Sequence, residues 1–166
     1  MTVSHGSTAT KAVETFFADI LLTSSSFLGI WCADAEMDHF TSTGLIEESV
    51  ARGLDAPAPN GGDDAVLRLV VRDDPRQEQR TVTPGDLARV FATLHLCEAL
   101  PDGYPLQWVP TAFGQQGSLP SPGWARRMLH AYRDALKGDE YAAGEIDAGD
   151  ADSLVQLAVF GCEVYG

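Results

Sequence analysis

The sequence has few cysteines and no long apolar run. Its three cysteines, Cys32, Cys97 and Cys162, are an odd number at long spacing. This favours free, buried thiols in a reducing compartment over a disulfide framework. No stretch approaches about 18 consecutive apolar residues, so we expect no membrane span. Residues 1–10 are polar, with no basic stretch ahead of an apolar one, so we expect no secretory signal and a cytoplasmic protein.

The familiar nucleotide-binding and hydrolase motifs are also missing. The chain has no glycine-rich loop ending in Lys and Ser or Thr, no G-x-G-x-x-G after a strand, no G-x-S-x-G and no H-E-x-x-H. Each of these patterns places specific atoms on a phosphate, an acyl group or a zinc ion. Their absence argues against those classes and predicts no bound cofactor. Active sites assembled from scattered residues stay open, but the balance favours a protein that is not an enzyme.

Positive charge is scarce at both ends of the chain. The net charge is −13, with ten acids and two bases in residues 1–64 and seven acids and no base in residues 138–166. The middle, residues 65–137, carries seven acids and nine bases. Both ends therefore repel nucleic-acid phosphates, and we predict no direct binding to DNA or RNA. An acidic surface can bind a basic protein or imitate DNA, or it can serve solubility alone; both interpretations stay open.

Length and patterning predict one domain over residues 1–166 of the α+β class. We expect it to be predominantly α-helical, with about five helices and a small two- or three-stranded β-sheet. Hydrophobic residues make up 45% of the chain, which is enough for a core. The β-branched run 66–71 is the best strand candidate, and we expect its partner at 78–82 or 163–165. The Pro- and Gly-rich stretch 55–64 is a candidate internal linker.

Helical spacing and capping residues mark five segments: 10–24 with a kinked continuation to 33, 43–53, 83–100, 121–137 and 147–161. The clearest start is the capping box at 83–86, which has a proline in its first turn. Asp147 and Asp150 form a carboxylate capping pair for the last helix. Between the third and fourth helices, the composition of residues 101–123 predicts an ordered loop that is rich in proline and aromatic residues.

Two clusters contain residue types that bind metals. Residues 34–39 alternate three carboxylates with other residues, but a calcium loop would have glycine where His39 stands, and a solvated helix end is the plainer interpretation. Cys32 and His39, with His95 and Cys97, could supply a tetrahedral zinc site. Their spacings are not those of a zinc finger, and His95 and Cys97 point apart on a helix. We therefore predict no metal site.

A small-ligand site is the main alternative to a protein-binding surface. We place it at the start of the fourth helix, beside the aromatic loop, on these residues: Tyr104, Trp108, Trp124, Arg126, Arg127 and His130. A helix N-terminus with two guanidinium groups suits a phosphate or another anion, and an aromatic ring can stack on a base. The plainer interpretation is that Trp124 belongs to the core and that both arginines pair with acids.

An acidic surface in the C-terminal region is the candidate partner-binding site. With the two capping carboxylates set aside, its members are Asp139, Glu140, Glu145 and Asp152. No base in residues 138–166 compensates them, so we expect them to face a basic partner protein.

The C-terminal segment also carries a distinctive pattern. It reads Asp147-Ala148-x-x-Ala151-Asp152-x-x-Val155-Gln156-Leu157-Ala158-x-Phe160-Gly161-x-x-x-Tyr165-Gly166. This resembles the closing segment of small acidic proteins encoded by bacteriophages of actinobacteria. The likeness is close over 143–166 and looser around 83–84 and 18–21, while Cys162 and the loop at 104–123 depart from it. The resemblance implies a phage source and a fold of this kind, with no catalytic residues to carry over.

These observations favour a non-enzymatic phage accessory protein in the host bacterial cytoplasm. It would bind and modulate a host protein, through an acidic or DNA-mimicking surface. The first alternative is a nucleotide- or anion-binding protein or enzyme built on the region of Trp124, Arg126 and Arg127. The second is a structural or oligomer-forming module, with the C-terminal segment at a contact between copies.

Overall fold

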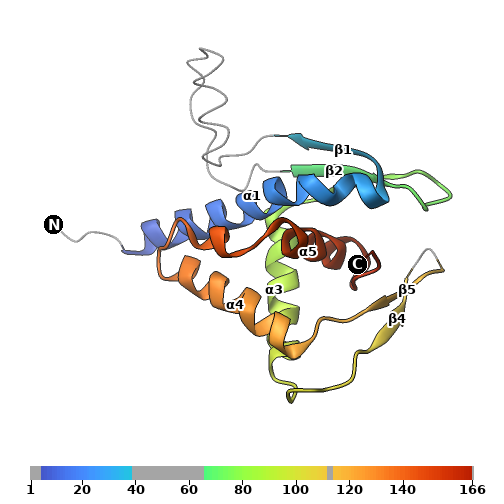
Figure 1. The fold of residues 1–166 in the computed structure, drawn as a ribbon. Helices are drawn as coiled ribbons and strands as arrows, with labels where there is room; N and C mark the ends of the chain where they lie inside the picture. The colour runs from blue at the N-terminus through green and yellow to red at the C-terminus, as the bar shows by residue number, and fades with distance from the viewer. Residues whose placement is uncertain (1–4, 39–65, 112–113, 166) are drawn as a thin grey trace, which may run out of the picture.

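The fold is α+β and dominated by helices. The computed structural model describes residues 5–38, 66–111 and 114–165, and in these segments four α-helices accompany two small antiparallel sheets (Figure 1). The helix count is therefore four in the described part of the chain, and the expectation of about five was wrong there. The helix predicted at 43–53 and the candidate linker at 55–64 lie outside the described residues.

The elements follow one another along the chain in this order: α1 (His5–Trp31), β1 (Cys32–Asp38), β2 (Val66–Val71), β3 (Gln79–Val82), α3 (Pro84–Glu98), β4 (Trp108–Pro110), β5 (Gln116–Ser118), α4 (Pro122–Leu136), the 3₁₀ helix η2 (Ala142–Glu145) and α5 (Ala148–Phe160). One sheet has the order β1-β2-β3, and β4 and β5 form a separate hairpin. In Figure 1, α5 runs beside α1, and α3 crosses behind both.

α1 is a core helix without the break that we expected at residues 24–26. It packs against α3, α4 and α5, and Phe16, Ile20 and Leu21 are fully buried. By length and composition alone, Thr10–Trp31 could also cross a membrane, which the search for an unbroken apolar run overlooked. Core helices of folded proteins pass the same test, and the buried face of α1 explains its apolar composition here.

The segment after α1 is a strand, whereas we expected a solvated helix end. β1 pairs antiparallel with β2 over Cys32–Asp38, with an irregularity between Cys32 and Asp34. The alternation of Ala and acidic residues has the period of a strand, because successive side chains point to opposite faces. The Arg72 guanidinium fixes the junction, since it donates hydrogen bonds to the carbonyls of Gly29 and Cys32 at 2.8 and 3.1 Å.

The partner predicted for the 66–71 strand at 78–82 is confirmed, since β2 pairs with β3. The other candidate, 163–165, was wrong, because Glu163 bridges to Ser118 of the hairpin instead.

The helix caps confirm the sequence analysis. Thr83 and Asp86 form both halves of the capping box. Ser121 caps α4 by accepting a hydrogen bond from the Trp124 amide, and the Asp147 carboxylate accepts one from the Asp150 amide at 2.8 Å. Each cap satisfies an amide that has no partner inside its helix.

Burial agrees with the predicted core face of α3, where Leu87, Phe91 and Leu94 are fully buried. Leu136, the last residue of α4, is half exposed. The Phe91 ring lies 5.5 Å from Phe16 and 4.9 Å from Tyr132, so α1, α3 and α4 share one aromatic cluster.

Candidate functional site

The predicted anion site does not form as expected. Arg126 pairs with Asp102 and also donates to the carbonyl of Glu98, while the Arg127 guanidinium lies 3.0 Å from the Asp150 carboxylate. The Trp124 indole donates to the same Asp150 oxygen at 2.8 Å. Both guanidinium groups are therefore already paired with carboxylates, as the plainer interpretation held. Trp124 itself is only partly buried.

The remaining ligand-site residues separate into two places. His130 is exposed on α4, with its Nε2 atom 3.7 Å from Asp134. Tyr104 and Trp108 lie on the loop that leads into the β4–β5 hairpin, where the Tyr104 hydroxyl accepts a hydrogen bond from Gln107. The structure brings Trp108 and Trp124 together, because both line a groove of about 350 Å³ beside the hairpin, and it brings Arg127 close to Trp124 through the Asp150 oxygen that they share.

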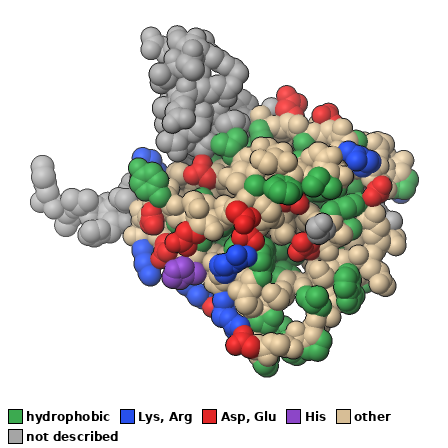
Figure 2. Space-filling view, in the orientation of Figure 1, with side chains coloured by type: hydrophobic (Ala, Val, Ile, Leu, Met, Phe, Trp, Pro, Cys, Tyr) green, Lys and Arg blue, Asp and Glu red, His purple; other side chains and the backbone are tan. Residues whose placement is uncertain are grey.

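This hairpin groove is open and largely apolar. Trp108 is 64% exposed and Leu106 is 57% exposed, and Leu119, Trp124 and Glu163 also line the groove. Figure 2 shows hydrophobic side chains gathered at the lower right, where Figure 1 places β4 and β5. An exposed indole beside exposed aliphatic side chains is typical of a contact surface rather than of a core.

Glu163 reaches the groove because the C-terminal segment is fastened to the hairpin. The backbones of Ser118 and Glu163 exchange two hydrogen bonds of 2.8 and 2.9 Å. Gly117 permits this contact, since a Cβ atom at this position would lie 2.4 Å from the Cys162 Sγ atom. Burial raises the pKa of the Glu163 carboxyl, and the neighbouring carboxylates of Asp152 and Asp150 raise it further, against a hydrogen bond from Ser153 that lowers it.

The acidic surface predicted for the C-terminal region is only partly exposed. Asp139 and Glu145 are exposed, and Glu140 lies 3.5 Å from the Lys11 ammonium. Asp152 corrects the expectation, because it is only 6% exposed. α5 is buried on nearly all sides, so a carboxylate in its middle turn must enter the interior.

The Asp152 carboxylate accepts hydrogen bonds from two neutral donors. The Trp31 indole donates at 2.8 Å and the Gln156 amide at 2.7 Å. Burial is the main cause that raises the pKa of the Asp152 carboxyl, and the two hydrogen bonds only partly oppose it. In the described part of the chain, no Lys, Arg or His forms an ion pair with Asp152.

A second cavity, of about 260 Å³, opens beside Asp152 between the C-terminal end of α1 and α5. We call it the Asp152 cavity. Its lining includes Phe27, Trp31, Tyr165 and Glu163, so aromatic rings and two carboxylates meet there. The Trp31 and Tyr165 rings stack at 5.9 Å with an interplanar angle of 8°. Glu163 lines both this cavity and the hairpin groove.

Four letters of the C-terminal pattern have clear structural roles. Asp147 caps α5, Gly161 ends it with a φ of 74°, and Tyr165 stacks on Trp31. The buried Gln156 holds the C-terminal segment, since its side-chain oxygen accepts hydrogen bonds from the amides of Val164 and Tyr165, both at 2.8 Å. The pattern therefore builds the Asp152 cavity and positions Glu163.

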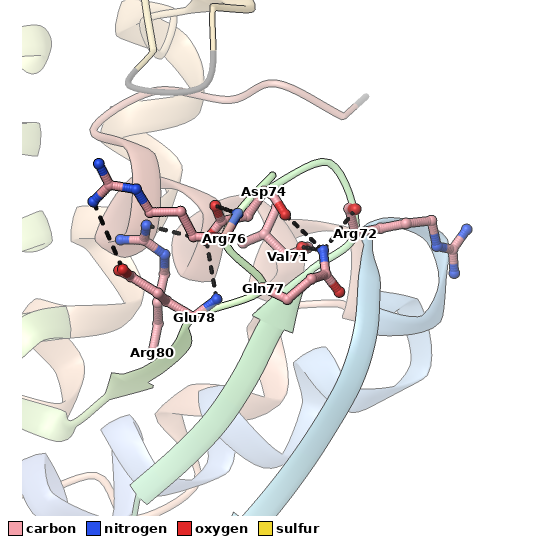
Figure 3. Close-up of polar contacts among 7 residues, drawn as sticks. All are labelled: Val71, Arg72, Asp74, Arg76, Gln77, Glu78 and Arg80. Carbon is pink, nitrogen blue, oxygen red and sulfur yellow. Dashed lines mark hydrogen bonds and ion pairs between the residues drawn. The ribbon is translucent and has the colours of Figure 1, made fainter.

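The β2–β3 turn contains another buried carboxylate, Asp74, which is 3% exposed (Figure 3). It accepts hydrogen bonds from the amides of Arg76 and Glu78 at 2.9 and 3.3 Å, and it lies 3.6 Å from the Arg80 guanidinium. The Arg76 amide is the largest of the causes that lower the pKa of the Asp74 carboxyl.

The same turn is closed from the side by Gln77. Its amide donates to three carbonyls, those of Asp74, Arg72 and Val71, at 2.7, 3.1 and 3.2 Å. Gln77 adopts a φ of 52°, a left-handed conformation that its side-chain bonds help to hold. The turn is internally satisfied, so we assign it a structural role.

The cysteines do not have the properties of reactive or metal-binding thiols. All three cysteines are free and buried, and burial is the main cause that raises the pKa of Cys32 to about 12. A protonated thiol is a poor nucleophile and a poor metal ligand. His39, which the zinc and calcium hypotheses both require, lies outside the described residues.

One group of metal-ligating side chains does come together on the surface. The ligand atoms of His130, Asp134 and Glu145 lie within 4.8 Å of one another, across α4 and η2. The Lys137 ammonium is 3.8 Å from Asp134 and competes with a cation for that carboxylate. Figure 2 shows acidic and basic side chains interleaved on this side of the molecule. The sequence did not predict this group, because Glu145 joins it through the packing of η2 on α4.

Comparison with known proteins gives no family for this chain. No protein-family model, no curated protein and no solved structure matches it.

Proposed function

We propose that the chain is a non-enzymatic phage accessory protein that binds and modulates a host protein through the hairpin groove. The observation that carries the proposal is the exposed indole of Trp108 beside Leu106, over a groove that also contains Trp124. Tryptophan is enriched among the residues that contribute most to protein interfaces, since it buries a large rigid surface at low entropic cost.

Charge defines the chemistry of the partner. Glu163 lies in the groove, and the pKa of its carboxyl is raised by burial and by neighbouring carboxylates. The whole chain carries a net charge of −13, which favours encounter with a positively charged surface. The occupant we propose is therefore a segment of a host protein with an apolar anchor flanked by arginine or lysine.

The acidic residues of 138–166 play a smaller part in this proposal than the sequence suggested. Asp152 is buried, Asp147 caps α5, the Asp150 carboxylate binds Trp124 and Arg127, and Glu140 pairs with Lys11. These four positions interrupt a row of phosphate-like charges. The contact surface in the proposal is therefore the hairpin groove, with the acidic side chains serving long-range attraction.

The test is capture of a partner from an actinobacterial lysate by the wild-type chain and by matched variants. Trp108→Ala removes the proposed anchor, while Tyr141→Ala removes an 82% exposed ring away from the groove. We expect one protein to be retained by wild type and by Tyr141→Ala, and to be released by added salt. Trp108→Ala should weaken its binding by about 30-fold, as for a central interface residue.

Two outcomes would contradict the proposal. In the first, no protein is retained specifically even at low salt. In the second, Trp108→Ala and Tyr141→Ala reduce retention equally, which would mean that the hairpin groove is not the contact surface.

A further inference from the structure

We infer that the Asp152 cavity binds an organic cation, either a guanidinium or an alkylammonium group. The cavity has about 260 Å³ of space, which is ample for such a group, because one water molecule takes about 30 Å³ in the liquid. The inference concerns a different cavity from the hairpin groove, although Glu163 lines both.

The walls have the chemistry that recognises organic cations. Phe27, Trp31 and Tyr165 contribute aromatic rings to the lining. The face of an aromatic ring carries partial negative charge and attracts ammonium and guanidinium groups, most strongly where water is excluded. Aromatic walls are common to sites that bind alkylated ammonium groups, whereas small hard metal ions prefer oxygen ligands alone.

The base of the cavity provides negative charge without a resident cation. Asp152 accepts one hydrogen bond on each carboxylate oxygen, both from neutral groups. A carboxylate has about four lone-pair positions, so acceptor capacity is left over. Among the described residues, those that line the cavity include Asp152 and Glu163 but no Lys, Arg or His.

One arginine near the C-terminal end of α1 is already engaged by backbone carbonyls. The Arg72 guanidinium lies at the C-terminal end of α1, where it donates to the carbonyls of Gly29, Ile30 and Cys32. It does not line the cavity. Two carboxylates therefore remain close together in a half-enclosed space, and the pKa values of both are raised. An incoming cation would relieve their mutual repulsion.

The cation could come from two sources with the same chemistry. It could be a free small molecule, or it could be an arginine or lysine side chain of the bound host protein. The second source rests on the proposed function, whereas the first does not. Because Glu163 lines both the cavity and the groove, a host protein bound in the groove lies close to the cavity.

The experiment is an NMR titration of the whole chain with methylguanidinium chloride, with sodium chloride at equal ionic strength as the reference. The indole N–H of Trp31 is the reporter, because it is hydrogen-bonded to Asp152. We expect a saturable shift of this signal in the millimolar range. Glu163→Gln should weaken binding about tenfold, which is about 1.4 kcal/mol, and Phe27→Leu should weaken it as well, since the aromatic face is lost.

The matched control is Glu145→Gln, which removes the same charge from an exposed position outside the cavity. It should leave the affinity unchanged. The inference is overturned if the Trp31 signal responds no differently from the sodium reference, or if calcium chloride saturates the site while methylguanidinium does not. It is also overturned if Glu145→Gln weakens binding as much as Glu163→Gln, since the attraction would then be diffuse.

Partner capture identifies the source of the cation. Phe27 lines the cavity but not the hairpin groove, so if Phe27→Leu weakens both methylguanidinium binding and capture of the host protein, the cation belongs to the partner. If it weakens only methylguanidinium binding, the natural cation is a free molecule. Failure of the proposed function would appear separately, as the lack of an effect of Trp108→Ala on capture.

Discussion

Asp74 and Asp152 are two buried aspartates with similar exposure and opposite surroundings. Asp74 receives two backbone amides and a guanidinium, and the pKa of its carboxyl is lowered. Asp152 receives only an indole and an amide side chain, and burial raises the pKa of its carboxyl. A buried carboxylate with charged and backbone partners stabilises the fold around it. One without a cation is costly to ionise, and such a cost is often found at functional sites.

The comparison teaches that burial alone does not assign a role to a carboxylate. The Asp74 turn is closed by hydrogen bonds between residues that are close in the chain, and these include the bonds to the Asp74 carboxylate (Figure 3). Asp74 is therefore stabilised without a ligand. The Asp152 carboxylate borders a cavity with aromatic walls and a second carboxylate. The first arrangement predicts that the protein loses stability when Asp74 is replaced. The second predicts that the Asp152 cavity binds a cation.

The largest expected effect is the loss of thermal stability when Asp74 is replaced. Asp74→Ala leaves the amides of Arg76 and Glu78 and the Arg80 guanidinium without their acceptor. Tm should fall by about 5 °C or more, as for loss of a buried hydrogen-bond network. Asp73→Ala is the neighbouring control, since its exposed carboxylate bonds only to the side chains of Tyr165 and Gln115. Equal losses of Tm in both variants would contradict the structural role of Asp74.

The next effect comes from supplying Asp152 with the cation that it lacks. Ile30 is exposed and lines the Asp152 cavity, so Ile30→Arg places a guanidinium at its rim. We expect the free energy of unfolding to rise by about 1 kcal/mol at neutral pH relative to Ile30→Gln, measured by urea denaturation. Methylguanidinium binding should be lost, because the cavity is occupied. An Ile30→Arg protein that is no more stable than Ile30→Gln and still binds methylguanidinium would break the comparison.

A third carboxylate, Asp19 on α1, tests the cost of burial by itself. Burial raises its pKa from 3.8 to about 6. Because the folded-state pKa is raised, this group favours folding while it is protonated, and that contribution is lost as the pH rises towards 6. Asp19→Asn should therefore stabilise the protein at pH ~7 by on the order of 1 kcal/mol, after allowance for partial exposure.

The pH dependence of the Asp19→Asn effect is the check. Unfolding free energies of wild type and variant should converge as the pH falls from about 6 towards 3.8. A constant difference over this range would mean that the substitution acts through packing and not through ionisation.

The smallest effect belongs to an exposed ion pair. Lys11 lies 3.5 Å from Glu140, with side chains that are largely in solvent. Lys11→Ala should change the free energy of unfolding by less than about 0.5 kcal/mol, because water and salt screen such pairs. A larger decrease in the free energy of unfolding, measured by urea denaturation, would contradict this expectation. It would show that exposed ion pairs contribute to stability on the same scale as the buried carboxylates.

The elements that are set by local chemistry could be predicted from the sequence. The capping box at Thr83, the apolar face of α3, the Asp147 cap and the pairing of β2 with β3 all depend on residues close in the chain. β1 was missed because its acids were interpreted as a solvated helix end, although their alternation has a strand's period. The short strands β4 and β5 were missed, because the segment 101–123 was predicted to be a loop.

The candidate sites could not be predicted, because they depend on contacts between distant residues. Asp152 meets Trp31 from the other end of the chain, and Glu163 reaches the groove only because the C-terminal segment pairs with Ser118. One signal was nevertheless available. α5 is apolar on nearly all sides, so polar residues within it, such as Asp152 and Gln156, had to be buried and bonded.

The most direct test of the account is an NMR pH titration that measures the pKa of the Asp74 and Asp152 side-chain carboxyls in the same folded protein. We predict a pKa below the usual 3.8 for Asp74 and above 3.8 for Asp152, and a lower Asp152 pKa when methylguanidinium is added. An Asp152 pKa at or below 3.8 in the free protein would contradict the account, because it would show that this carboxylate is already stabilised without a cation from outside.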